Sequence, residues 1–487
     1  MGKRIEIDPI TRLEGHGKIS IFLDDKGIVE NAYFQVPELR GFEEFCKGRH
    51  VTDLPQITPR ICGVCPWAHH MAATKALDEV YHVKPSSAGR KLRELAYNTF
   101  YFSDHLLHFY YLAAPDFVCG PKAPPGERNV LGAIAKLGID KGKEVIKHRV
   151  YGEEILKTLG GKSQHPASGL PGGVSRGLTE EERKDFEAKL VSCVEFAKFS
   201  LVLFDDLVLK NKMYRELILS KDIYYHETNY MGMVDENNKI NFYDGMLRVV
   251  NPSGKEIEKF DYREYPKHIS EHKEEWSYIK FLYLKKLGWK GFVDGPDSGV
   301  YRVAPLARLN VSDGFTTPLA QAAYEKLYSI LPKPVHHTQV FHWARLIEML
   351  YAAEKALELI RDPEITSKDI QTIPTATPTE GVGVVEAPRG TLFHHYRTDE
   401  KGIVNMVNLL VATLNNSAPI CMSVKKAAQA LIKGPDVEEG LLNMVEMAFR
   451  PYDPCLGCAT HSLPGETPMI LSIHDSHGKM IKEVRRD

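Results

Sequence analysis

Two Cys-x-x-Cys pairs stand at opposite ends of this chain and constrain how it can fold. The first lies in RICGVCPWAHH (residues 60–70) and the second in DPCLGCATH (residues 453–461). Each pair places two thiolates within reach of one soft metal ion. A fold that brings both pairs together would join the two ends of the chain at a single metal site. The four candidate ligands are Cys62, Cys65, Cys455 and Cys458.

The spacing alone leaves three interpretations of these cysteines open. A structural zinc site takes the same four thiolates, although zinc ribbons usually hold their pairs closer in sequence. A catalytic or redox metal site is the second interpretation, and unrelated thiols are the third. Eight cysteines in 487 residues is far from the disulfide density of a small secreted domain, which favours metal or redox chemistry. The other four are expected to be small buried hydrophobes: Cys46, Cys119, Cys193 and Cys421.

Composition argues against several classes of protein. The net charge of -2 gives no electrostatic reason to expect a nucleic acid or a membrane surface as a partner. No stretch approaches the roughly 20 uninterrupted apolar residues of a membrane-spanning helix. The N-terminal segment lacks the apolar core of a signal peptide. The sequence also contains no P-loop and no Gly-x-Gly-x-x-Gly turn after a strand.

Hydrophobic periodicity predicts an α+β fold that is predominantly helical. Alternating segments predict N-terminal strands at 4–8, 17–24 and 28–36. Helices are predicted at 88–113, 179–211, 338–361 and 436–449. The first should end before Pro115, and the second should begin with a capping box from Thr179 to Glu182. The Tyr-, Phe- and Gly-rich segment 219–303 predicts a β-rich insertion.

We therefore expect one domain over residues 1–461, ending with the second metal motif, with a large helical-bundle core. Its parts would be an N-terminal β region with the first metal motif (1–70), helical core (71–218), the β-rich insertion (219–303), and helical core with the second metal motif (304–461). Residues 462–487 would form a C-terminal extension.

Seven motifs carry a family resemblance, and they follow one another from end to end of the chain. They are DPITRLEGHG (8–17), RGFEEFCKGR (40–49), RICGVCPWAHH (60–70), HLLHFYYLAAPDF (105–117), HPASGLPGGV (165–174), EAPRG (386–390) and DPCLGCATH (453–461). In this order, with both cysteine pairs intact, they resemble the large subunit of nickel-iron hydrogenases. That likeness implies the reversible heterolytic oxidation of H2 to protons and electrons.

The resemblance also implies the metals of the site. Nickel would be bound by all four thiolates, and iron with carbon monoxide and cyanide ligands would share two of them. Cys62 and Cys455 would be terminal on nickel, while Cys65 and Cys458 would bridge to iron. Soft thiolate ligands suit both metals. A magnesium ion would be held by Glu43 and His461, together with water and a backbone carbonyl near residues 408–410.

Five further residues are candidates for the reaction itself. By resemblance, Glu14 would carry protons beside a terminal cysteine, although a glutamate here could instead cap a turn. Arg389 would lie over the metals, with Asp116 and Asp453 as its carboxylate partners. His69, four residues after Cys65, could donate a hydrogen bond to a cysteine sulfur. His105 and His108 belong to a family motif, but each could equally be a core histidine.

One segment departs from the family pattern. LLVATLNN (409–416) replaces a Pro-Ser/Thr-Thr-Trp-Asn run, so Ala412 stands where a hydroxyl would bind cyanide, with Thr413 beside it. This variant is more similar to the cytoplasmic, multi-subunit branch of the family. An iron–sulfur small subunit is an expected partner because the chain has no further cysteine cluster, and flavin or iron–sulfur electron-transfer subunits would follow it.

The C-terminal extension implies one more partner. In the family, a maturation endopeptidase removes such a tail after nickel insertion, which would make His461 the mature C-terminus. A permanent tail remains the alternative. Other functions of the same fold also stay open: a hydrogen sensor, a complex I-like subunit, which would lack the cysteines, or a scaffold with a structural four-thiolate metal site.

Overall fold

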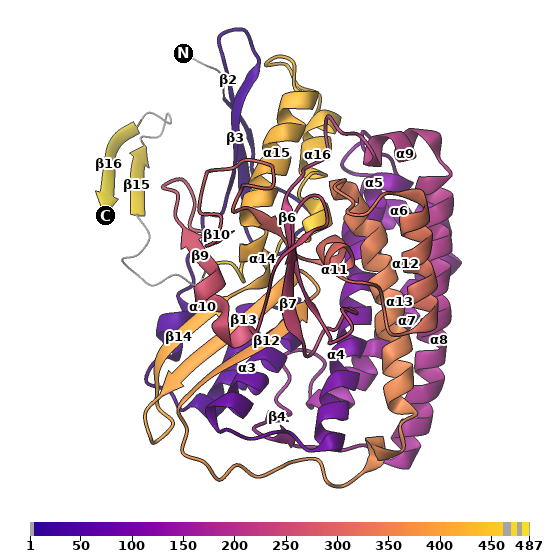
Figure 1. Ribbon diagram of the computed structural model, residues 1–487. Helices are drawn as coiled ribbons and strands as arrows, with labels where there is room; N and C mark the ends of the chain where they lie inside the picture. The colour runs from indigo at the N-terminus through magenta and orange to yellow at the C-terminus, as the bar shows by residue number, and fades with distance from the viewer. Residues whose placement is uncertain (1–3, 461–468, 475–479, 487) are drawn as a thin grey trace.

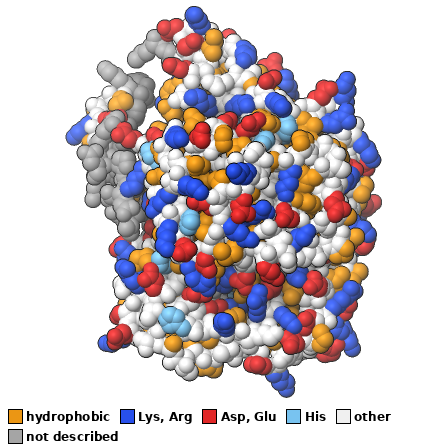
Figure 2. Space-filling view, viewed as in Figure 1, with side chains coloured by type: hydrophobic (Ala, Val, Ile, Leu, Met, Phe, Trp, Pro, Cys, Tyr) orange, Lys and Arg blue, Asp and Glu red, His pale blue; other side chains and the backbone are white. Residues whose placement is uncertain are grey.

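A computed structural model describes residues 4–460, 469–474 and 480–486. Long helices form a layer on one side of the molecule, and several small sheets lie beside it (Figure 1). This arrangement confirms the α+β, mainly helical expectation. No described helix is both long and apolar enough to cross a membrane. Basic and acidic side chains are interspersed over the face drawn in Figure 2, in keeping with the net charge of -2.

The helices vary widely in length. The long ones are α3 (Pro66–Val80), α4 (Ser87–Leu107), α7 (Ile139–Gly160), α8 (Glu180–Phe204), α12 (Pro318–Ile330), α13 (Phe341–Ile360) and α15 (Ser417–Leu431). The short ones are α1 (Phe42–Cys46), α2 (Leu54–Ile57), α5 (Ala114–Val118), α6 (Val130–Leu137), α9 (Lys212–Ile218), α10 (Tyr265–His268), α11 (Pro305–Val311), α14 (Ala412–Asn415) and α16 (Glu439–Glu446). Helices α4 and α13 pack along each other in the core.

Three larger sheets complete the core. The N-terminal sheet is antiparallel and holds β1 (Arg4–Ile7), β2 (Lys18–Leu23) and β3 (Val29–Gln35). The central sheet has the order β11 (Tyr301–Arg302), β6 (Asn229–Val234), β7 (Met246–Val250), β8 (Glu256–Phe260). The third holds β12 (Glu380–Ala387), β13 (Gly390–Thr398) and β14 (Val404–Leu410).

Two-stranded pairs account for the other strands. They are β4 (Gly169–Leu170) with β5 (Gly173–Val174), β9 (Ile269–His272) with β10 (Phe281–Leu284), and β15 (Met469–His474) with β16 (Met480–Arg486). The last pair follows the second cysteine motif and stands beside the main body in Figure 1.

Most predicted elements are confirmed, with changes at their ends. The predicted capping box begins α8. The Thr179 hydroxyl accepts a hydrogen bond from the Glu182 amide, and the Glu182 carboxylate accepts one from the Thr179 amide. The prediction that the helix ends before Pro115 is wrong. After α4, a wider π-helical turn spans His108–Ala113, and Pro115 then occupies the first turn of α5, where its missing N–H costs nothing.

The sheet of β12, β13 and β14 was not expected, because residues 304–461 were predicted to be helical apart from the second metal motif. In β12, every residue after Glu380 is buried, the charged Glu386 included, so buried and exposed positions do not alternate along the strand. Hydrophobic periodicity alone cannot distinguish such a fully buried strand from a segment of buried helix. The segment 219–303 does contain strands, as expected, and its β6 is buried along its whole length.

Two glycines let β12 lie directly against α3. A Cβ atom on Gly383 would stand 2.0 Å from the Ala72 carbonyl oxygen, and one on Gly381 would stand 2.5 Å from the Val80 amide nitrogen. Because α3 begins immediately after Cys65, this close packing fixes the position of the first cysteine pair. The sheet is therefore part of the support of the site.

Replacing Gly383 tests this packing. Gly383→Ala should lower the free energy of unfolding by about 1–3 kcal/mol, the usual cost of overpacking a core, because neither backbone can yield locally. Thermal unfolding of the purified complex measures the change. Gly434→Ala is the matched control, since a Cβ there meets no atom within 4 Å. Equal stability of the two variants would contradict the argument.

Candidate metal centre

The fold brings the four cysteines of the two pairs into one buried cluster. Their sulfur atoms all lie within 4.8 Å of one another. The Cys455 sulfur is 2.8 Å from that of Cys458 and 3.1 Å from that of Cys62, and the sulfurs of Cys65 and Cys458 are 3.3 Å apart. Four thiols this close, and this deeply buried, form a ligand set for soft metal ions.

The N-terminal turn completes the wall of this cluster. Glu14 and Cys455 form a short parallel bridge, in which the Leu456 amide donates to the Glu14 carbonyl at 2.9 Å. Gly15 lies against the same loop with a φ of 84°, and a Cβ there would stand 2.7 Å from the Gly457 amide nitrogen. This close approach therefore requires glycine, both for space and for conformation.

The Glu14 carboxylate faces the cysteines, as the sequence predicted. Its Oε2 atom lies 3.0 Å from the Cys455 sulfur and accepts a hydrogen bond from the Gly457 amide at 3.0 Å. Burial raises the pKa of Glu14, and the negative charge of Cys62 adds to the rise. A buried carboxyl group with a raised pKa beside a candidate metal ligand is a candidate for proton transfer.

Arg389 is buried near the cysteines, but only one of its two predicted partners is correct. Its guanidinium group forms ion pairs with Asp453, at 2.9 Å, and with Asp104, at 3.0 Å. Burial raises the pKa of Asp104 to about 6, against the opposing effect of Arg389. The Nε atom of Arg389 has no hydrogen-bond partner within the described part of the chain. It is a buried donor that a bound group could satisfy.

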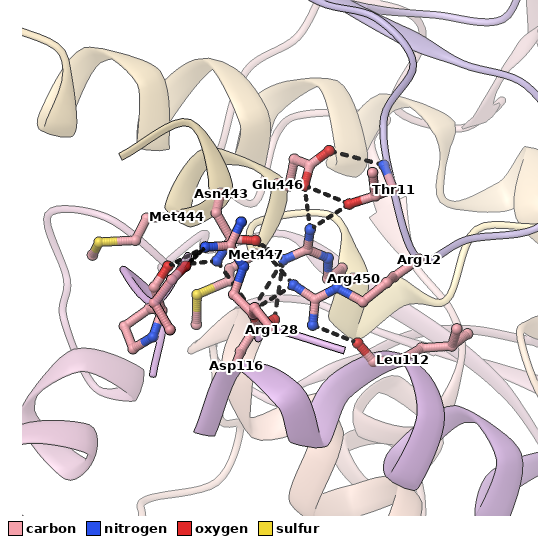
Figure 3. A network of polar contacts seen from close by, with 12 residues as sticks. Thr11, Arg12, Leu112, Asp116, Arg128, Asn443, Met444, Glu446, Met447 and Arg450 are labelled. Carbon is pink, nitrogen blue, oxygen red and sulfur yellow. Dashed lines mark hydrogen bonds and ion pairs between the residues drawn. The ribbon is translucent and has the colours of Figure 1, made fainter. Parts of the chain in front are cut away.

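The predicted contact between Arg389 and Asp116 is wrong. Asp116 instead accepts hydrogen bonds from Arg12 at 2.5 Å and Arg450 at 3.0 Å, within the polar network of Figure 3. The π-helical turn His108–Ala113 separates Asp116 on α5 from Asp104 on α4. Asp104 directly precedes His105, the first residue of the HLLHF motif. This position was the sequence feature that could have pointed to Asp104 as a partner of Arg389.

The network around Asp116 has a structural role. Arg450 also contacts Glu446 and Asn443, and Glu446 accepts from the Thr11 amide and hydroxyl, each at 2.9 Å (Figure 3). The residues come from the N-terminal turn, from α5 and from the segment leading to the second cysteine pair. The network therefore ties together the two parts of the chain that carry Glu14 and Cys455.

Two further polar side chains support the site, and the sequence assigned no role to the first of them. Arg345 on α13 is fully buried; its guanidinium donates to the Pro451 carbonyl at 3.0 Å, and burial lowers its pKa to about 10. The Thr413 hydroxyl accepts from the Cys455 amide at 3.0 Å, with Ala412 buried beside it. Thr413 therefore supports a cysteine ligand directly.

The remaining candidate residues divide into three outcomes. His69 contacts a cysteine sulfur as predicted, with Nε2 at 3.4 Å from Cys458, and burial lowers its pKa to about 4. Glu43 is buried and accepts from the Leu409 amide at 2.8 Å, beside the backbone segment expected to complete a magnesium site. His461 lies outside the described residues.

The two histidines of the HLLHF motif are core residues. His105 Nε2 lies 3.0 Å from the Glu348 carboxylate, and His108 Nε2 lies 2.9 Å from the Arg450 carbonyl oxygen. Burial holds the pKa of both histidines well below the ordinary value. They join α4 to α13 and to the second metal motif rather than facing the cysteines.

The residues present fit a reactive metal centre better than a structural one. A structural zinc ion needs only four thiolates. Here the thiols share their buried surroundings with an arginine, two carboxylates paired to it and a glutamate of raised pKa. Burying such charges is costly unless the site uses them. Fold and site together define a large helical metalloenzyme subunit with a thiolate-bound catalytic metal.

Comparison with known proteins identifies the family. A family model described as nickel-dependent hydrogenase matches residues 40–124 and 144–461, and a second, described as HoxL-like, matches residues 4–39. The chain therefore belongs to the nickel-dependent hydrogenases, and it is the catalytic large subunit of a nickel-iron hydrogenase. This confirms the resemblance drawn from the seven motifs.

Individual relatives cover the chain almost completely. It is 49% identical over 485 residues to an iron-sulfur subunit of the F420-non-reducing hydrogenase of Archaeoglobus profundus, with 99% of each chain covered. It is 38% identical to the beta subunit of the NAD-reducing hydrogenase HoxS of Cupriavidus necator, with 100% of each covered. A crystal structure of an NAD+-reducing nickel-iron hydrogenase in the H2-reduced state gives a TM-score of 0.88 at 36% identity, covering 94% of this chain and 99% of that one.

The corrected partner of Arg389 can be tested by two matched substitutions. Asp104→Asn should lower the rate of H2 oxidation about 10- to 100-fold, as expected when a group that orients a metal site is removed. Asp116→Asn should instead lower the free energy of unfolding by about 3–5 kcal/mol, because it removes the charge partner of the Arg12 guanidinium and leaves the buried Arg450 with Glu446 alone. Activity and thermal unfolding of both variants measure the difference.

The stabilising effect of Asp116 also has a defined pH range. Burial opposes its ionisation, but Arg450 and Arg12 together hold the pKa of Asp116 below its ordinary value of 3.8. A carboxyl group with a lowered pKa stabilises the fold fully above the unfolded value and loses that effect as the pH falls through the folded value. The stability difference between wild type and Asp116→Asn should therefore vanish only in strong acid. Its loss between pH 5 and 7 would contradict this.

Proposed function

We propose that this subunit carries out the reversible heterolytic oxidation of H2 at a nickel–iron site held by its four thiolates. The observation that most supports this is the contact between the Glu14 carboxylate and the Cys455 sulfur, at 3.0 Å, inside a buried cluster. It places a proton acceptor directly beside a metal ligand. A structural metal site would gain nothing from this contact, and it would bear the cost of burying the carboxylate.

The four thiolates would divide between the metals. All four cysteines would hold nickel, and Cys65 and Cys458 would also hold an iron that carries carbon monoxide and cyanide. When bound, these soft metals supply an open position at which H2 is polarised. Thr413 could supply the hydroxyl missing at Ala412, since accepting from the Cys455 amide leaves its own O–H able to donate.

The side chains around the thiolates would then act as proton acceptor and fixed cation. Glu14 would take up the proton from H2 cleavage, because its carboxylate lies against the Cys455 sulfur and burial raises its pKa. Arg389, held by Asp104 and Asp453, presents a rigid guanidinium group whose Nε remains available to ligands of the iron. Hydrogen would reach the site through a cavity of about 140 Å³, lined by Val64, Phe100 and Leu107 among others and bordered by Asp104.

A magnesium ion near the C-terminal end of the domain would stabilise the closed site. Glu43 supplies one carboxylate, and the segment around Leu409 lies against it. His461 is the second protein ligand proposed by family likeness. Residues 1–461 would then form one catalytic domain that is closed when the chain ends at His461.

Electrons must leave through other subunits. Both pairs of adjacent cysteines are used at the metal centre, so an iron–sulfur small subunit is the proposed direct partner, followed by flavin or iron–sulfur subunits. Relatives named NAD-reducing and F420-non-reducing support a multi-subunit, cytoplasmic complex. A maturation endopeptidase would remove residues 462–487 after nickel insertion.

Infrared spectroscopy of the purified complex tests the proposed metal site. Wild type should show absorption bands of metal-bound carbon monoxide and cyanide, which a zinc site does not produce. Cys455→Ser should abolish H2 turnover, because it removes a thiolate ligand that also contacts Glu14. Cys193→Ser is the control, a buried cysteine on α8 that does not belong to the four-thiol cluster. A wild type without these bands, with zinc at the four thiolates, would overturn the proposal.

Intact mass of the large subunit tests the proposed processing. In nickel-loaded, active complex the chain should end at His461, whereas cells grown without nickel should accumulate the form that ends at Asp487. The reason is that the second cysteine pair lies only three residues before His461, so a retained tail would continue from the edge of the metal site. An active, nickel-loaded enzyme with residues 462–487 intact would contradict this prediction.

A further inference from the structure

A chain of hydrogen bonds leads away from one of the metal-binding sulfurs. The Cys458 sulfur contacts His69 Nε2 at 3.4 Å, and His69 Nδ1 contacts His394 Nε2 at 3.0 Å. His394 Nδ1 in turn contacts the Tyr396 hydroxyl at 2.5 Å. His69, His394 and Tyr396, which together we call the relay, are all buried. The established activity assigns no role to His394 or Tyr396.

The secondary structure explains why these side chains line up. His394 and Tyr396 are two residues apart on β13, so both point to the same face of the sheet. That face lies against α3, whose first turns carry His69 just after Cys65. The glycine packing of β12 against α3 holds this sheet at a fixed distance from the helix. The relay is therefore built from rigid elements.

Hydrogen-bond chemistry allows only one direction along this chain. A metal-bound thiolate has no proton, so His69 Nε2 must donate to the Cys458 sulfur. A neutral imidazole has one N–H and one acceptor nitrogen, and burial favours the neutral form. His69 Nδ1 must then accept from His394 Nε2, and His394 Nδ1 must accept from the Tyr396 hydroxyl. The phenol is the donor that sets the tautomer of both rings.

We propose that Tyr396 and His394 are positioning residues that hold His69 as a hydrogen-bond donor to the Cys458 sulfur. This rests on the proposed function, in which that sulfur binds the metals. A hydrogen bond to a thiolate withdraws electron density from it, so the relay tunes how strongly Cys458 donates to its metals. Without the phenol, His394 can take the other tautomer, and the donor to Cys458 is lost.

Tyr396→Phe tests the relay in the complete enzyme, because it removes one hydroxyl and keeps the ring. The sulfur X-ray absorption edge should show increased metal–thiolate covalency, and the carbon monoxide and cyanide bands should move to lower wavenumber. Tyr351→Phe is the matched control: Tyr351 is also buried, and its hydroxyl lies 3.4 Å from the Ile240 carbonyl oxygen rather than against a histidine of the relay. That variant should leave both spectra unchanged.

The serial arrangement gives a second test. His394→Phe breaks the same chain one link closer to the metals, so it should cause the same spectral shift as Tyr396→Phe. The double variant should shift no further than either single variant, because coupled residues are not additive. Unchanged spectra, or shifts that add, would overturn the relay. Thermal unfolding of each variant checks that the fold is kept.

The two readouts separate this inference from the proposed function. Infrared bands that are present but unmoved in Tyr396→Phe would overturn the relay alone. Absence of the bands in wild type would overturn the proposed iron ligands. In that case the sulfur edge of the nickel-bound thiolates still decides the relay, since it requires only a metal on Cys458.

Discussion

The structure depends on bringing two cysteine pairs from opposite ends of the chain together in a dry interior. Four buried thiolates repel one another, and burying them is unfavourable unless positive charge compensates. Metal ions bound to the four thiolates would supply positive charge. The protein contributes Arg389, which is itself balanced by Asp104 and Asp453. Each surrounding layer of the fold serves to keep this arrangement closed.

Two sets of contacts keep the ends joined. At the backbone, Glu14 bridges to the Cys455 loop, and Gly15 makes room for Gly457. Further out, Arg450 and Asp116 connect the N-terminal turn to the helices that precede the second cysteine pair (Figure 3). Glu14, the proposed proton acceptor, is therefore positioned by the same contacts that close the metal site. A change in either set should affect both stability and proton transfer.

Much of the site could be predicted from the sequence, but the partners of its charged groups could not. Cys-x-x-Cys spacing led to the four cysteines, and the family resemblance of the surrounding motifs led to Glu14 and Arg389. Asp116 was expected as a partner of Arg389 from its place in a family motif, and Asp104, just before that motif, was not singled out; a π-helical turn at His108–Ala113 lies between the two. His394 and Tyr396 gave no signal, since a relay across α3 and β13 is a tertiary contact.

The sequence by itself determined the chemistry of this protein: four thiolates at metal-ligand spacing, a carboxylate and an arginine in recognisable motifs, and a mainly helical α+β fold. These follow from local patterns, which short-range spacing preserves. Only the tertiary structure decided which carboxylates hold Arg389, how α3 lies on an unexpected sheet, and which sulfur His69 contacts. Those choices depend on packing between segments hundreds of residues apart, and no local pattern encodes the distance between them.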